Sequence, residues 1–388
     1  DKLALRVAGG HQQWGGWIDS PVERNVNSSD SDSLRVKLNA QPAENLQIDA
    51  SYWMVRDTFD SNTGSNDDYF SRTVIDVPVT QDYDTYGLNV TYDFAAMRFT
   101  SATSYIDYES RAILDYAGTF NLPDAVLDTF DRAQTFTEEV NLSSNSSGAW
   151  QWSIGAIYRD NETAFRQVRR LTNGVPAFGY SAPNIWTDSS DSLAVFGEIT
   201  RGFADGRFEI TAGVRYFRDQ YDMDQSSRQN GSNTGLFVRE NTFDKVSPRV
   251  ALTWHPHDDL MVYTSYSEGF RSGYSQTPVV LLSAPQLGSV RPDNLKNLEL
   301  GTKGALLGGL VAFEAAVYYI KYDSIHQQLG INVGTPAQPQ NVLAIVNGPA
   351  ASGYGTDLAV TIKPAKGLAF GIGMSLSELT FDSSVISN

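Results

Sequence analysis

Four arginines lie close together in the middle of an acidic chain, and their side chains are the first candidates for binding chemistry. They are Arg159, Arg166, Arg169 and Arg170. A planar guanidinium group presents a fork of N–H donors that matches carboxylates, phosphates and anionic metal chelates. Three interpretations stay open: contact with an anionic ferric chelate, contact with the phosphate of a surface glycolipid, or a solvated polar loop.

A second candidate group follows the strand-like run at 259–269. Phe270, Arg271 and Tyr274 stand where this strand is expected to give way to a loop. Two aromatic rings and a cation at a strand end suit the wall of a ligand vestibule, and packing within the loop is the alternative. The predicted ligand-binding set is therefore Arg166, Arg169, Arg170, Phe270, Arg271 and Tyr274.

Catalytic and metal-binding patterns do not emerge from the sequence. The four histidines are His11, His255, His257 and His326, and their spacing fits no metal site. No nucleophile elbow, phosphate loop or pair of catalytic acids is recognisable. A hydrolase would need a serine and a histidine on adjacent strands, and no histidine is placed for that. We therefore predict no enzyme activity, no cofactor and no metal ligands.

Composition narrows the class of protein further. The 388 residues carry a formal net charge of −16, so nucleic acid is not an expected partner. Cysteine is absent, which excludes disulfides. No apolar run approaches the roughly 18 residues of a membrane-spanning helix. The chain opens at Asp1 as a strand already under way, and we expect it to be a piece of a longer protein.

The elements that must position these residues are strands, because apolar and polar residues alternate with a period of two throughout the chain. In the run 208–216, Phe208, Ile210, Val214 and Tyr216 alternate with polar residues and glycine. We expect the apolar stripe of each strand to face lipid and the polar stripe to face an aqueous lumen. The predicted lumen-facing residues are Glu198, Glu209, Arg215, Arg249, Glu299, Glu314 and Asp357, with Lys363 on the same register.

The links between strands alternate between short and long. Short turns are expected at 41–45, 95–96, 145–148, 204–206, 255–259, 307–309 and 364–367. Long polar connections are expected between them, roughly at 19–32, 58–84, 117–131, 171–191, 224–243, 276–292 and 330–341. Short turns at one end and long loops at the other are typical of a transmembrane β-barrel. We therefore predict an all-β, antiparallel transmembrane barrel with about fifteen strands in this chain. Single-chain bacterial barrels have even strand numbers, so an odd count indicates that further strands belong to the complete barrel.

The order and spacing of several motifs add a family resemblance. The residues that carry it are Val246–Arg249, Tyr263–Arg271 and Leu298–Lys303, supported by Phe196–Glu198, Ala212–Tyr216, Gly353–Leu358 and Pro364–Leu368. This series resembles the barrel of TonB-dependent outer-membrane receptors over nearly the whole chain. The resemblance implies a barrel of about 22 strands, of which residues 1–388 would form roughly strands 3 to 17 within one domain. It also implies an N-terminal plug domain, which is not in this chain.

The same resemblance implies a function and a location. A TonB-dependent receptor lies in the outer membrane of a Gram-negative bacterium, among lipid and lipopolysaccharide, and meets a TonB-type energy-coupling protein through an N-terminal segment. Its expected cargo is a ferric siderophore, with cobalamin, a glycan or a small aromatic compound as alternatives. A passive porin is the competing interpretation, and it predicts fewer strands, a loop folded into the lumen and no plug.

Overall fold

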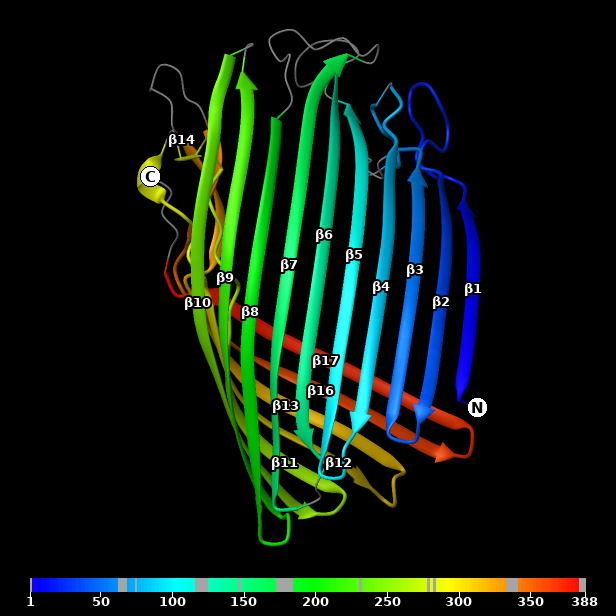
Figure 1. Ribbon diagram of the computed structural model, residues 1–388, viewed down its shortest axis with the longest axis vertical. Helices are drawn as coiled ribbons and strands as arrows, with labels where there is room; N and C mark the ends of the chain where they lie inside the picture. The colour runs from blue at the N-terminus through cyan, green and yellow to red at the C-terminus, as the bar shows by residue number, and fades with distance from the viewer. Residues whose placement is uncertain are drawn as a thin grey trace.

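Fifteen long antiparallel strands form one curved sheet in the computed structural model of the protein (Figure 1). The structure describes residues 2–61, 68–73, 75–115, 125–145, 148–171, 184–229, 232–277, 280–281, 284–332 and 341–383. Strands β1 to β10 form the wall that faces the viewer in Figure 1, and β11 to β17 curl behind it. The predicted all-β fold and the number of strands are confirmed.

The strands follow one another in the sheet in nearly the order of the sequence. They are β1 (Leu3–Trp14), β2 (Ser29–Ala43), β3 (Leu46–Phe59), β4 (Val79–Asp93), β5 (Met97–Asp115), β6 (Ala125–Ser144), β7 (Trp150–Leu171), β8 (Asn184–Phe203), β9 (Phe208–Gln229), β10 (Ser232–His257), β11 (Leu260–Gly269), β12 (Asn294–Leu306), β13 (Val311–Asp323), β16 (Ala351–Ala365) and β17 (Leu368–Phe381). A separate hairpin, β14 (His326–Asn332) with β15 (Asn341–Asn347), lies between β13 and β16 in the sequence, and a short 3-10 helix, η1, covers Pro285–Leu287. Among the described residues, β1 and β17 are the two edges of the large sheet, and each pairs with one neighbour.

The expected tight turns join the strands at one end of the sheet. Ala204, Asp205 and Gly206 all have positive φ between β8 and β9, and Leu307, Gly308 and Gly309 repeat this between β12 and β13. Glycine reaches these backbone angles without a steric penalty, which is why two of the tightest turns contain it. The opposite ends of β2 to β10 lie at the top of Figure 1.

Two predicted long connections are much shorter than the sequence suggested. The region 224–243 was expected to be a loop, but β9 continues to Gln229 and β10 starts at Ser232, so most of it is strand. Likewise β8 begins at Asn184, inside the region 171–191. Most of these residues are polar and show no sustained apolar alternation, but they continue the hydrogen-bond ladder of a hairpin that extends beyond the lipid layer.

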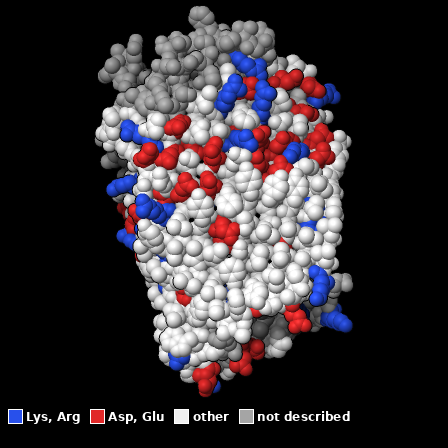
Figure 2. Space-filling model, viewed as in Figure 1, with Lys and Arg blue, Asp and Glu red and all other residues white. Residues whose placement is uncertain are grey.

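The outer face of the sheet is apolar and exposed, as expected for contact with lipid. Register pairs place Leu88, Trp152 and Val214 on the same face, and all three side chains are exposed in the isolated chain. Phe313 shares this face and is half-buried. Figure 2 shows a broad uncharged surface there, with charged side chains gathered above it. Within the described residues, no helix has the length and apolar character to cross a membrane.

Candidate functional site

The inner face of the sheet carries the polar residues that the alternation predicted. Glu198, Glu209, Arg215, Arg249, Glu299, Glu314 and Asp357 all occupy register positions opposite to the exposed apolar stripe. Arg249 Nη1 lies 2.5 Å from Glu198 Oε2 across Gly213, whose missing side chain leaves the space for this contact. A second cluster joins Tyr263, whose hydroxyl donates to Glu299 at 2.5 Å, and the pair Lys303 and Glu314 at 3.1 Å.

The connection between β11 and β12 folds toward this inner face at the extracellular end. We call the described part of this connection, residues 270–277, 280–281 and 284–293, the inward segment. Phe270 packs against Phe217 of β9 with ring centroids 5.0 Å apart. Gly273 lies against the ring of Phe243 on β10 so closely that a Cβ atom would come within 2.5 Å of it. Phe217 and Phe243 both stand on the inner register of their strands, so the segment lies inside the wall.

A buried carboxylate holds both ends of the inward segment together. Asp293 has no exposed side-chain surface, and Arg271 binds it twice, with its backbone N–H at 2.7 Å from Oδ1 and its Nε at 2.6 Å from Oδ2. The Tyr322 hydroxyl donates to the same Oδ2 at 2.8 Å. Because a buried carboxylate is costly unless it accepts several hydrogen bonds, this arrangement fixes the position of Arg271.

Further hydrogen bonds connect the inward segment to the strands around it. Ser272 Oγ and Ser190 Oγ donate to the two oxygens of buried Asp219 at 2.6 and 2.7 Å. Asn241 bonds both Ser275 and Ser289, at 2.7 and 2.9 Å.

The hairpin β14–β15 meets the same segment. Gln276 exchanges hydrogen bonds with the backbone of Ile345 on β15, and Tyr274 meets the ring of His326 on β14 edge-on, with centroids 5.5 Å apart. These contacts join the inward segment, the wall and the hairpin into one unit.

The electrostatics of the unit favour a fixed cation beside neutral aromatic rings. The hydrogen bonds that Arg271 donates to Asp293 raise the pKa of Arg271, and burial raises the pKa of Tyr274. The guanidinium of Arg271 lies 5.4 Å from the centre of the Tyr322 ring, and 54% of its side chain remains exposed. The site therefore presents one held cation and several aromatic surfaces, which suits a planar or anionic ligand.

The structure brings Phe270, Arg271 and Tyr274 together, but it does not bring the arginines of β7 to them. Arg166 and Arg170 share the outward register with Trp152, and they lie within the strand rather than in a loop. Arg159 takes the inner register and donates to Ser190 Oγ at 3.1 Å. Arg169 pairs with Leu127 through the strand ladder, and its side chain lies outside the described part of the structure.

Sequence reasoning missed Asp293, Tyr322 and His326. Tyr322 lies near the end of β13 and His326 begins β14, so only the three-dimensional pairing brings them to Asp293. The one signal in the sequence is an acid directly before β12, matched to an arginine two positions after the end of β11. No group of at least three acidic or histidine side chains within the described residues has the geometry to hold a metal ion.

A belt of hydroxyls and charges crosses the outer face above the apolar surface. Four tyrosines of the outward register each donate to an outward carboxylate at 2.6 to 2.9 Å. The pairs are Tyr52 with Asp84, Tyr158 with Asp191, Tyr216 with Asp244 and Tyr266 with Glu268. Aromatic rings whose hydroxyls leave the apolar layer are typical of a membrane–water interface.

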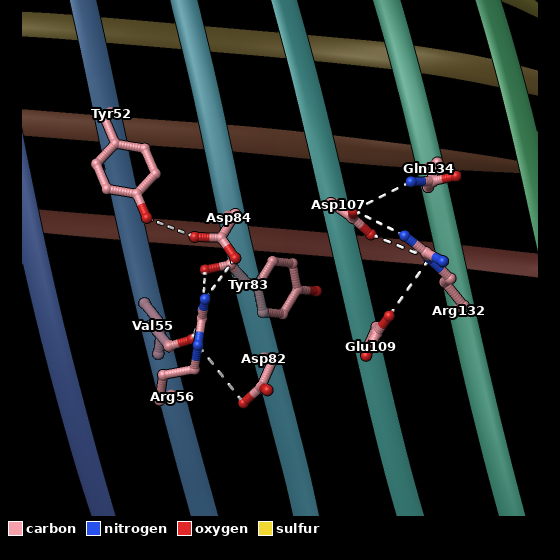
Figure 3. A network of polar contacts seen from close by, with 10 residues as sticks. All are labelled: Tyr52, Val55, Arg56, Asp82, Tyr83, Asp84, Asp107, Glu109, Arg132 and Gln134. Atoms are coloured by element: carbon pink, nitrogen blue, oxygen red, sulfur yellow. Dashed lines mark hydrogen bonds and ion pairs between the residues drawn. The ribbon is translucent and has the colours of Figure 1, made fainter.

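Two networks within this belt are drawn in Figure 3. Arg56 lies 2.5 Å from Asp84 and also donates to the backbone carbonyls of Val55 and Tyr83. Arg132 binds Asp107 at 3.0 Å and Glu109 at 3.4 Å. The belt therefore marks the level at which the strands leave the hydrocarbon and enter a polar layer.

An apolar outer face, a polar inner face and an aromatic girdle together define an outer-membrane β-barrel. The model of the family described as "TonB dependent receptor-like, beta-barrel" matches residues 16–387, and the chain belongs to this family. Proteins of this family lie in the outer membrane of Gram-negative bacteria.

Solved structures show the same fold. The ferric yersiniabactin uptake receptor FyuA from Yersinia pestis aligns with a TM-score of 0.79 and 16% identity, over 98% of this chain and 57% of that one. BauA, the ferric preacinetobactin receptor from Acinetobacter baumannii, aligns with 0.70 and 15%, over 99% and 58%. The copper transporter OprC aligns with 0.70 and 13%, over 97% and 57%. The chain thus spans under two thirds of these proteins. No curated protein sequence matches it.

Proposed function

We propose that this chain is part of an outer-membrane receptor that takes up a scarce ligand by TonB-type energy coupling. The observation that carries the proposal is the inward segment, which holds Phe270, Arg271 and Tyr274 on the lumen side of the extracellular end. Ligand would meet these residues first and then descend along the polar inner face. In the complete protein, residues 1–388 would belong to one barrel domain whose lumen holds an N-terminal plug.

A ferric siderophore is the cargo that we propose. Such complexes combine anionic or strongly polar chelating groups with planar rings, and the held guanidinium of Arg271 beside Tyr274 and Tyr322 matches both. Ferric ligands appear in the names of FyuA and BauA. Copper in the name of OprC is a reason to keep non-iron cargo as the alternative, because one fold serves several ligands.

Passive diffusion through a porin is the other candidate. An inward loop alone does not separate the two, because the porin hypothesis also expects one. The test is uptake of radiolabelled ferric siderophores by cells that express the full-length gene product, with and without a proton-motive force. Energy-dependent uptake of a chelate, reduced about tenfold by replacing Tyr274 with alanine, supports the proposal. Uptake that persists without energy, for solutes of any chemistry below a size limit, would overturn it.

A further inference from the structure

Three arginines gather on the outer face of the barrel, near the extracellular ends of β5 and β7. Phe130 of β6 pairs in register with Arg111 on one side and with Arg166 on the other. Arg170 stands further along β7 on the same outward face. Figure 2 shows basic side chains above a band of acidic ones on this face of the molecule.

A single half-hidden carboxylate organises two of the three guanidinium groups. Arg111 donates to Asp128 through Nε at 3.0 Å and Nη2 at 2.7 Å, and Arg170 donates through Nε at 3.1 Å. Asp128 is only 12% exposed, whereas Arg111 is 58% exposed. Asp128 thus anchors both guanidinium groups. Arg111 keeps more than half of its side chain exposed, whereas Arg170 is 22% exposed and also donates Nη1 to the Leu171 carbonyl at 3.3 Å, so its Nη2 group is the donor left for a ligand. Asp115 lies at the end of β5, and β6 separates it from Arg170 on β7.

Arg166 adds a cation that the other groups do not neutralise. Its side chain is exposed, and it forms no ion pair within the described part of the chain. Three guanidinium groups therefore lie near two carboxylates, those of Asp128 and Asp115. This part of the outer face carries an excess of positive charge, although the protein as a whole is acidic. The outward arginine Arg56 differs, since Asp84 and two carbonyl groups occupy its donors.

The height of the cluster identifies the layer that it faces. Tyr105 lies at the level of the girdle, because its ring is 6.2 Å from that of Tyr86, which is 5.0 Å from the ring of Tyr52. Arg111 lies on the same face of β5, six positions further along the strand. At ~3.4 Å per residue and a tilt of ~40°, Arg111 stands about 15 Å above the girdle along the barrel axis. The headgroup layer of a phospholipid extends only about 5–8 Å beyond the hydrocarbon. A phospholipid phosphate is therefore too low, and a sugar layer that carries phosphate is at the right height.

We propose that Arg111, Arg166 and Arg170 form a binding site for a phosphate group on the sugar core of lipopolysaccharide. The forks of Arg111 and Arg170, held by Asp128, supply preorganised donors, and Arg166 supplies the unpaired charge. Asp128 is a positioning residue in this site. The inference depends on the location of the barrel in the outer membrane and is independent of its cargo.

The test uses the purified full-length protein and lipopolysaccharide with either a phosphorylated or an enzymatically dephosphorylated core. We expect wild-type protein to bind the phosphorylated form about tenfold more tightly. The triple variant Arg111→Gln/Arg166→Gln/Arg170→Gln should lose this preference, and the single change Arg166→Glu at an exposed position should weaken it without affecting folding. Arg56→Gln is the matched outward control and should keep the preference.

Three results would overturn the proposal. The first is equal binding of the two lipopolysaccharide forms by wild-type protein. The second is an equal loss of preference in Arg56→Gln, which would indicate a diffuse charge effect. The third is a preference that the triple variant retains. Cargo uptake by the triple variant should match that of wild type, so failure of the transport proposal and failure of this site give different results.

Discussion

Arg271 and Asp293 face each other across the inward segment, 22 positions apart in the chain, with Nε and Oδ2 separated by 2.6 Å. Arg271 follows the last residues of β11, and Asp293 directly precedes β12. Since Arg271 contributes its backbone N–H as well as its side chain, the contact fixes both the direction of the chain and the position of the charge. The two ends of the segment are therefore closed by one buried carboxylate.

Replacing Asp293 with alanine should loosen the inward segment. The change leaves the Tyr322 hydroxyl and the Arg271 donors without their partner, at a cost of about 1–3 kcal/mol. We expect faster hydrogen exchange in residues 270–277 and 284–293, measured by mass spectrometry. Asp323→Ala is the control, because Asp323 stands at the end of β13 and its pair with Lys296 is part-exposed. Equal exchange rates in the two variants would show that Asp293 does not hold the inward segment in place.

The strand pattern and the sidedness of the sheet could be predicted from sequence because each strand has a lipid face. The alternation of apolar and polar residues from Phe208 to Tyr216 indicates the lipid-facing side of β9. The same register places Glu209 and Arg215 on the inner side. The contact between Arg271 and Asp293 could not be predicted. Asp293 resembles any polar loop residue until β12 and β13 pair and bring Tyr322 beside it. Likewise, the outward side of Arg166 could not be predicted, because β7 continues as a polar strand where no lipid marks its outer face.

Two adjacent residues offer a direct test of which face meets lipid. Ala212 stands on the outer register of β9, midway between Phe208 and Tyr216, and Thr211 faces inward, where its hydroxyl lies 2.9 Å from that of Thr200. Ala212→Arg should destabilise the folded barrel by about 2–4 kcal/mol, the cost of an arginine at the bilayer midplane. Thr211→Arg should cost less than about 1.5 kcal/mol, because the lumen is wet. Urea unfolding from lipid vesicles measures both, and the opposite order would refute the assignment.

Close packing over glycine predicts an overpacking penalty at Gly301. The ring of Tyr263 lies over this glycine, and a Cβ atom there would come within 2.4 Å of the ring. Gly301→Ala should therefore destabilise the barrel by about 1–3 kcal/mol, and a second change, Tyr263→Ser, should recover part of that loss. Gly371→Ala on β17 is the matched control, since its nearest neighbour is Thr361 at 3.9 Å. Equal effects at the two glycines would show that strand propensity, rather than the ring, sets the cost.

Asp128 should make the outer tips of β5 to β7 sensitive to acid. Asp128 stands beyond the girdle, outside the lipid-spanning part of β6, and hydrogen bonds from Arg111, aided by Arg170 and opposed by burial, hold the pKa of its carboxyl below the usual value near 4. A lowered pKa in the folded state means that the contribution to stability is complete above pH ~4 and is lost as pH falls through the folded value. Protection of residues 125–131, corrected for the intrinsic pH dependence of amide exchange, should therefore fall as the pH drops from 7 to below about 4. Asp128→Asn should exchange faster than wild type at pH 7, and the two should converge at low pH because a protonated aspartate resembles asparagine. A constant difference across this range would show that the carboxylate charge does not hold the arginines.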